Sequence, residues 1–320
     1  MTLIGHEKPR RAWMQACQGD RLHHAWLLAG PSGVGKATFA RLCAAELVGA
    51  GEGAGSPSPD NHPDILALSR APADDKEARN RDEGKPFKRK RNISVEQVRT
   101  LQRRLNTRPT LGARRAIIID PADDLESGAA NALLKSLEEP PAGNVFFLVT
   151  HRPGRLLPTI RSRCRVLRFD RLPEEQVRQV LAHERPEVGG EHLDTAIAGA
   201  NGSPGAAMTW IDEDLARVDA AMRALLRDSV RSAEHRGALA AAIGARPTPE
   251  RLAAVFTLAR RLLAGEVRSA PAEARPRIIE AHAALVDLAA RAPTANFDPG
   301  LLAMQIGGLL ASAALPREAA

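Results

Sequence analysis

The residues with the clearest chemical potential are glycines and a lysine near the N-terminus. Gly30, Gly35 and Lys36 have the spacing G-x-x-x-x-G-K. The apolar run His24–Ala29 before them predicts a strand, and Ala37–Val48 after them has the spacing of a helix. In such a loop the backbone N–H groups curl around a phosphate, the helix dipole favours its negative charge, and the lysine adds a point charge. The spacing and its context therefore predict a phosphate-binding loop.

One group that nucleotide hydrolysis normally needs is missing from this loop. A serine or threonine usually follows the lysine, because its hydroxyl helps to hold Mg²⁺, whereas this chain has Ala37. Thr38 comes one position too late and is expected to point elsewhere on the helix. The loop is therefore open to a second interpretation, in which Gly30, Gly33 and Gly35 are needed only for the shape of the turn.

A second strand-forming run carries an acidic residue at its end. Ile117–Ile119 leads into Asp120, as in the strand that faces the metal in nucleotide-hydrolysing proteins. Such proteins place another acid directly after it to orient the attacking water, but Pro121 has neither an acceptor side chain nor an amide hydrogen. Asp123 and Asp124 could reach a metal only after a rearrangement. Independent ATP hydrolysis is not expected, and binding of ATP or ADP is left open. The degenerate nucleotide site would comprise Gly30, Gly33, Gly35, Lys36, Ala37, Thr38 and Asp120.

Two longer motifs follow, Asn131–Pro141 (NALLKSLEEPP) and Thr159–Cys164 (TIRSRC). In this order behind a phosphate-binding loop they closely resemble the AAA+ clamp-loader family, whose members include subunits of bacterial DNA polymerase III and of eukaryotic replication factor C. Motifs of this length are specific, and the resemblance extends over roughly Leu22–Ala207. It implies an AAA+ P-loop domain with a parallel sheet, then a small helical lid and an all-helical collar.

The resemblance also implies that Arg163 is an arginine finger, the residue that reaches the γ-phosphate bound by an adjacent subunit. A guanidinium suits this task because its planar, permanently charged donors neutralise charge on the transferring phosphoryl group. Ser162 and Cys164 flank it as motif and interface residues. Arg161 and Arg165 are expected to pair with acidic side chains instead.

Two further features distinguish this chain within the family. Members that hydrolyse ATP carry a lid arginine in the pattern Gly-Ser-x-Arg, and Gly205 stands at that position here. Many members hold a four-cysteine zinc module before a His-Pro-Asp segment, but residues 50–61 contain no cysteine, although His62–Asp64 is kept. Neither zinc nor another metal is therefore expected. The three cysteines are far apart and are expected to be reduced thiols in the cytoplasm.

Carried over to this chain, these features predict a noncatalytic subunit of the DNA polymerase III clamp-loader complex. Its expected partners are the gamma/tau and delta clamp-loader subunits, with the sliding clamp and primed DNA contacted through the complex, and no cofactor is required. Three alternatives remain open: an ATP-hydrolysing subunit of the gamma/tau type, a helicase-loading or recombination AAA+ ATPase, and a regulatory module whose degenerate loop still holds nucleotide. Ala37, Pro121 and Gly205 together argue against the first.

The elements that must position these residues follow from periodicity and from turn residues. The fold class is α/β: besides the run before the loop, strands are expected at 64–68, 116–120, 145–150 and 166–169, and helices at 94–106 and 127–137. Beyond Pro173 the pattern is helical only. We expect three domains: a nucleotide-fold domain at 1–170, a helical lid at 171–210 and a helical collar for oligomerisation at 211–320.

Charge, aromatic content and the lack of long apolar runs exclude some classes of protein but do not identify the partners of this chain. The formal charge of +7 and the pI of about 9.9 fit contact with nucleic acid and, equally, a general bias towards arginine. The polar segment 71–91 is expected to be mobile, and its basic run Lys85–Arg91 either touches DNA or only aids solubility. An aromatic content of 3% without tyrosine argues against base-stacking platforms. No apolar run predicts a signal peptide or a membrane span.

Overall fold

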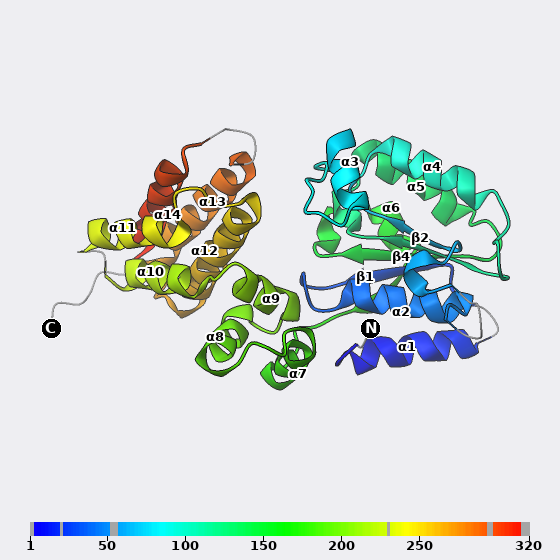
Figure 1. Cartoon of the computed structure of the whole chain (residues 1–320), viewed down its shortest axis with the longest axis horizontal. Coiled ribbons are helices and arrows are strands. Elements are labelled where there is room, and N and C mark those ends of the chain that lie inside the picture. Colours follow the sequence, from blue (N-terminus) through cyan, green and yellow to red (C-terminus); the bar gives the residue numbers. More distant parts are fainter. Residues whose placement is uncertain (1–2, 20–21, 52–56, 229–230, 293–296, 315–320) are drawn as a thin grey trace. The chain divides into compact units, whose positions relative to one another are not determined.

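A computed structural model describes residues 3–19, 22–51, 57–228, 231–292 and 297–314 of the chain (Figure 1). These residues fall into two compact units. The first comprises Met1–Val180 with Asn201–Gly205, and the second Leu181–Ala200 with Ala206–Ala320. The three-domain division, with its boundaries at residues 170 and 210, stays a prediction.

The first unit is built around a five-stranded parallel sheet with the strand order β2-β3-β4-β1-β5. β1 therefore lies between β4 and β5, and the glycine loop leaves from the interior of the sheet. The expected parallel α/β layer is confirmed, and its strands begin and end within one residue of the predicted positions. The strands are β1 (Ala25–Ala29), β2 (Ile65–Leu68), β3 (Arg115–Ile119), β4 (Asn144–Thr150) and β5 (Arg165–Arg168).

Helices cover both faces of this sheet (Figure 1). Leu27 packs with residues of α4, α5 and α6, whereas its neighbours Trp26 and Leu28 pack with residues of α1 and α2. Because successive side chains of a strand point to opposite faces, all five residues of β1 are buried. The helices of the two layers are α1 (Glu7–Gln18) and α2 (Lys36–Val48) on one face, and α4 (Val95–Leu105), α5 (Ser127–Glu138) and α6 (Pro158–Ser162) on the other.

The start of α4 is set by a capping box, as the sequence predicts. The Ser94 hydroxyl accepts a hydrogen bond from the Gln97 amide at 3.4 Å, and the Gln97 side chain accepts one from the Ser94 amide at 3.2 Å. Val98, Leu101 and Leu105 then bury one stripe of the helix against the sheet. The predicted helix 94–106 is confirmed with both ends one residue shorter.

The polar segment 71–91 contains a helix that its composition does not reveal. This helix, α3 (Asp75–Asp82), begins at Asp74, whose side chain accepts a hydrogen bond from the Glu77 amide at 2.8 Å. The Glu77 carboxylate in turn accepts a hydrogen bond from the Lys88 amide at 2.8 Å, which ties the basic run back to the helix. Local capping and charge contacts, rather than an apolar core, therefore organise this segment.

The second unit is helical throughout its described residues, which confirms the expected all-helical region. Its core includes Trp210, Leu258, Leu285 and Ile306. None of the helices that the structure describes is long and apolar enough to cross a membrane. The helices after the sheet are α7 (Glu174–Glu184), α8 (Gly190–Ala200), α9 (Pro204–Asp212), α10 (Ala216–Arg227), α11 (Ser232–Ile243), α12 (Pro249–Ser269), α13 (Arg275–Arg291) and α14 (Pro299–Ala313).

A buried ion pair ties β2 and β3 to the loop that precedes β3. Asp64 is fully buried and accepts hydrogen bonds from the amides of Thr110, at 2.7 Å, and Leu111, at 2.8 Å. The Arg115 guanidinium, only 3% exposed, lies 3.4 Å from the Asp64 carboxylate and also donates to backbone carbonyls of residues 104–108. Burial alone would raise the pKa of Asp64, but the hydrogen bonds from Leu111 and Thr110 and the charge of Arg115 outweigh it and hold that pKa below its usual value.

Asp64→Asn should lower the free energy of unfolding by about 3 kcal/mol or more, because it leaves the Arg115 charge buried without a counter-charge. Urea unfolding followed by tryptophan fluorescence measures this loss. Asp60→Asn, at an exposed position nearby, is the matched control and should change stability by no more than about 0.5 kcal/mol. Equal midpoints for the two variants would show that the buried pair does not hold this part of the sheet.

Candidate functional site

The glycine loop between β1 and α2 has a backbone that only glycine adopts without strain. Gly33 and Gly35 have φ of 74° and 107°, in the left-handed region that other residues rarely occupy. At Gly30 the constraint is space, since a Cβ atom there would lie 2.1 Å from the Phe169 carbonyl oxygen. All three glycines are therefore required by the shape of the loop alone, whether or not a phosphate binds.

Lys36 does not extend into an open phosphate site. Its side chain is 2% exposed, and its Nζ donates hydrogen bonds to the carbonyl oxygens of Gly30, at 2.8 Å, and of Pro31. Burial lowers the pKa of Lys36 to about 8, although the charges of Asp120 and Asp123 act in the opposite direction. The lysine of the motif is thus engaged with the carbonyl groups of its own loop.

The segment before α9 binds the same loop from another part of the chain. The Ser203 hydroxyl donates to the Ser32 carbonyl at 2.9 Å, and the Gly205 amide donates to the Gly33 carbonyl at 2.9 Å. A Cβ atom on Gly205 would lie 2.8 Å from the Gly33 Cα atom. This close approach leaves no room for the lid arginine that ATP-hydrolysing clamp-loader subunits carry at this position.

A histidine that the sequence reasoning did not single out completes the contacts of the loop. His6 is buried, and its Nε2 lies 2.6 Å from the Val34 carbonyl oxygen. Because a carbonyl can only accept, this nitrogen carries the proton. Burial is also the main reason why the pKa of His6 is lowered, which favours the neutral ring. The five consecutive carbonyls from Gly30 to Val34 therefore each accept a hydrogen bond from within the chain.

The acidic residues beyond β3 do not fit a magnesium nucleotide. Asp123 accepts hydrogen bonds from the Thr150 hydroxyl and the His151 amide, both at 2.6 Å, so its carboxylate is held at the end of β4. Asp124 forms an ion pair with Arg70 at 3.2 Å. Neither side chain is available for a metal without breaking these contacts.

The remaining residues of the predicted nucleotide site supply too few ligands. Asp120 is partly buried, and burial raises its pKa, although the charges of His151, Arg41 and Lys36 oppose that change. Ala37 has no hydroxyl. In the described part of the chain, no three His, Cys, Asp or Glu side chains lie close enough to hold a metal ion. Beside a nucleotide Mg²⁺ is usually held by one or two side chains together with phosphates and water, and of the predicted site residues Asp120 alone has a carboxylate.

The two long motifs meet through one ion pair. Arg163 lies at the C-terminal end of α6, with its side chain 34% exposed, and its guanidinium is 2.7 Å from the Glu138 carboxylate at the end of α5. The Thr159 carbonyl accepts a second bond from Arg163 at 3.0 Å and a bond from the exposed Ser162 hydroxyl, also at 3.0 Å. Cys164 instead packs into the core, and burial raises the pKa of its thiol to about 12. Arg163 thus reaches the surface beside residues that hold it.

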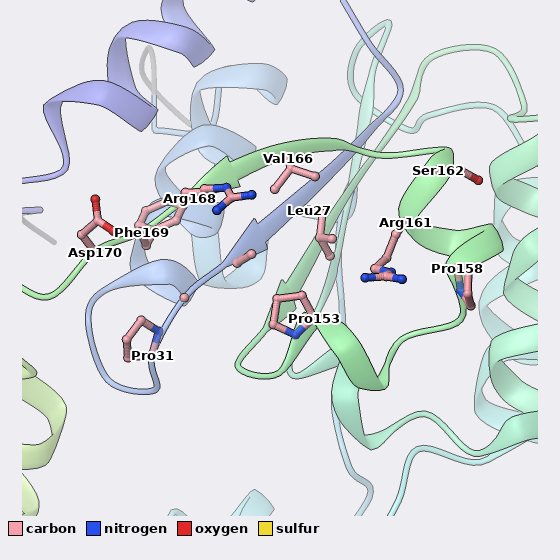
Figure 2. A pocket seen from close by; sticks show the side chains of 12 residues that line it. Leu27, Pro31, Pro153, Pro158, Arg161, Ser162, Val166, Arg168, Phe169 and Asp170 are labelled. Carbon is pink, nitrogen blue, oxygen red and sulfur yellow. The ribbon is translucent and has the colours of Figure 1, made fainter. Parts of the chain in front are cut away.

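The expected roles of the neighbouring arginines were wrong. Arg165 lies over the Trp26 ring, 5.1 Å from its centroid, and forms no ion pair with any residue that the structure describes. Arg161 likewise has no acidic partner within the described ranges, and it lines an open hollow beside β5 (Figure 2). The nearby acid Glu138 pairs with Arg163.

The burial of Lys36 has a consequence that depends on pH. Because the folded chain holds the pKa of Lys36 near 8 instead of 10.5, the unfolded chain binds more protons between these values. The free energy of unfolding of the wild type, relative to Lys36→Met, should therefore rise from about pH 8 to 10.5, by at most ~1.4 kcal/mol per pH unit. Chemical unfolding of both proteins over this range measures the difference.

Lys135→Met is the matched control, since it removes an exposed lysine without removing a buried hydrogen bond. A difference between the wild type and Lys36→Met that stays level, or falls, as pH rises would contradict the buried position of the Lys36 ammonium.

Comparison with known proteins agrees with the motifs. The family described as DNA polymerase III, delta subunit, matches residues 5–173. The DNA polymerase III subunit delta' of Pseudomonas aeruginosa is 34% identical over 203 residues, which are 60% of this chain and 57% of that protein. The subunit delta' of Escherichia coli is 40% identical over 129 residues, 40% of this chain and 38% of that protein. The subunit tau/gamma of Haemophilus influenzae is 31% identical over 191 residues, 57% of this chain and 25% of that protein.

These alignments span about half, or less, of the length of the relatives. Two of these relatives are subunits delta' of DNA polymerase III. The expected resemblance to clamp-loader subunits of DNA polymerase III is confirmed. Since the family match covers more than half of the 320 residues, this chain belongs to the DNA polymerase III delta subunit family.

Proposed function

We propose that this chain is a noncatalytic subunit of the DNA polymerase III clamp-loader complex and that Arg163 acts as an arginine finger on ATP bound by a neighbouring subunit. The observation that carries the proposal is the position of Arg163, whose guanidinium reaches the surface at the end of α6. The noncatalytic part is supported by Ala37 and Pro121, which stand in place of the magnesium-binding hydroxyl and the acid that orients water. The Arg163 guanidinium is partly exposed and can therefore approach a nucleotide bound by an adjoining subunit.

The ion pair with Glu138 suggests how the finger is kept ready. It holds the Arg163 guanidinium in one orientation while no phosphate is near. Because both side chains are partly exposed, such a pair stabilises by only about 0–1 kcal/mol, and a phosphate with more negative charge displaces the carboxylate at little cost. The guanidinium then neutralises charge on the phosphoryl group as the neighbour hydrolyses its ATP.

The proposed partners follow from the same resemblance. They are the gamma/tau and delta subunits of the complex, and the chain contributes to loading the sliding clamp on primed DNA through that complex. The helical region after residue 210 serves as the collar, and residues 171–210 form the lid. No zinc, magnesium or nucleotide bound by this chain is required, and its place of action is the cytoplasm.

An ATP-hydrolysing subunit of the gamma/tau type is the second candidate, because the tau/gamma subunit of Haemophilus influenzae is also similar to this chain. Against it stand the methyl group of Ala37, the proline at 121 and the contact of Gly205 with the loop. ATP turnover by the purified chain that is lost in Lys36→Ala would favour this candidate.

Arg163→Ala should lower ATP hydrolysis at the neighbouring site by about 10³-fold or more, because the transferring phosphoryl group loses its guanidinium. The measurement uses a reconstituted complex in which the other ATP sites have been inactivated, since those sites keep their own fingers and would mask the loss. Single-turnover hydrolysis then reports the one site that this chain serves.

Arg155→Ala is the matched control, because it removes an exposed arginine from the preceding turn without touching the two motifs. Glu138→Gln should retain most of the activity, since it removes only the resting partner of the finger. If Arg163→Ala assembled normally and hydrolysed ATP at the rate of the Arg155→Ala complex, Arg163 would not be the finger.

A further inference from the structure

An open hollow lies in the first unit beside the edge strand β5 (Figure 2). Its volume is about 610 Å³, within the range of small-molecule sites. It opens between β5, the end of β1 and the segment that leads from β4 through α6. The ends of parallel strands are a common position for ligands in such sheets. The lining residues are Leu27, Ala29, Gly30, Pro31, Pro153, Pro158, Arg161, Ser162, Val166, Arg168, Phe169 and Asp170.

Two arginines give this hollow its charge. Figure 2 shows Arg161 extending into it from α6 and Arg168 lying across from it on β5. Both side chains are exposed, and neither has an acidic partner among the residues that the structure describes. The single acid of the lining, Asp170, lies at the end of the hollow away from Arg161 (Figure 2). The arrangement leaves two guanidinium groups ready for an anion.

The remaining lining is mostly apolar. Leu27 and Ala29 of β1 lie beneath the hollow and are buried, and the rings of Pro153 and Pro158 also line it (Figure 2). Val166 is 46% exposed although it belongs to a strand, so its side chain offers apolar surface to a ligand. A molecule that fits must therefore combine negative charge with an apolar surface.

We propose that this hollow binds a nucleoside phosphate, with Arg161 and Arg168 holding its phosphate groups and Val166 and the prolines contacting its base. A guanidinium presents paired N–H donors that match phosphate oxygens, which makes arginine well suited to such a ligand. The site lies within one chain and does not include Arg163. It shares α6 and Ser162 with the surface that the proposed function directs to a neighbouring subunit, so its binding is measured on the isolated chain.

The proposal is tested by calorimetric titration of the purified full-length chain with ADP and, separately, with inorganic pyrophosphate, both without Mg²⁺. ADP should bind, and more tightly than pyrophosphate, because only ADP covers the apolar wall. Arg161→Gln and Arg168→Gln should each weaken ADP binding about tenfold or more, since each removes charge-assisted hydrogen bonds to phosphate. Asp170→Asn should strengthen binding, because it removes the one negative charge of the lining.

Arg155→Gln is the matched control, because this exposed arginine lies close in sequence but does not line the hollow. It should bind ADP within about twofold of the wild type. The proposal is overturned if the wild type binds neither probe, or if both arginine variants bind ADP as Arg155→Gln does. Unchanged thermal unfolding of the variants ensures that lost binding is not lost folding. Since the isolated chain suffices, failure here leaves the role of Arg163 in the complex unaffected.

Discussion

The hydrogen bonds accepted by the carbonyl groups of the glycine loop are the constraint on which the first unit depends. From Gly30 to Val34, every carbonyl accepts a bond from Lys36, the 203–205 segment or His6. These donors hold the loop and tie the N-terminal segment and the start of α9 to it, and at Val34, which is buried, an unpaired carbonyl would be costly. The backbone shape suited to phosphate is thus retained for a structural reason.

The contacts of the loop relate several positions that are far apart in the sequence and differ from the pattern of ATP-hydrolysing clamp-loader subunits. Gly205 must lack a side chain because its amide approaches the Gly33 carbonyl closely. Two of the three N–H donors of the Lys36 ammonium are used by the loop carbonyls. Position 37 has no hydroxyl and position 121 has no acid, so two groups that serve a magnesium nucleotide are missing together. Arg163 differs from these loop residues because its side chain is partly exposed. Its ion pair with Glu138 is weak enough to be replaced by a contact with a phosphate.

Local patterns in the sequence were sufficient for most of the fold. The capping box at Ser94, the apolar runs of the sheet and the spacing of the glycines each depend on near neighbours in the chain, so periodicity and turn chemistry identify them. The helix α3 was not predicted, because capping and charge contacts stabilise it and the amino-acid composition of the segment does not reveal such contacts.

The details of the candidate site were less predictable, since its partners are distant in sequence. His6 and Val34 lie 28 residues apart, and Ser203 and Ser32 lie 171 apart, so no local pattern signals either bond. The motifs identified Arg163 as a candidate. They did not predict that Arg163 pairs with Glu138 or that Arg161 lines a hollow. Those facts depend on how the short helix α6 is turned against α5, and this is decided by packing.

Steady-state ATP hydrolysis by the purified chain with Mg²⁺ tests the central claim most directly. A site with Ala37 in place of the magnesium-binding hydroxyl and Pro121 in place of the acid that orients water predicts no turnover above the background of the buffer. Turnover at a measurable rate, abolished when Lys36 is replaced by alanine, would contradict it, because the loop would then open to hold a nucleotide in the position needed for hydrolysis.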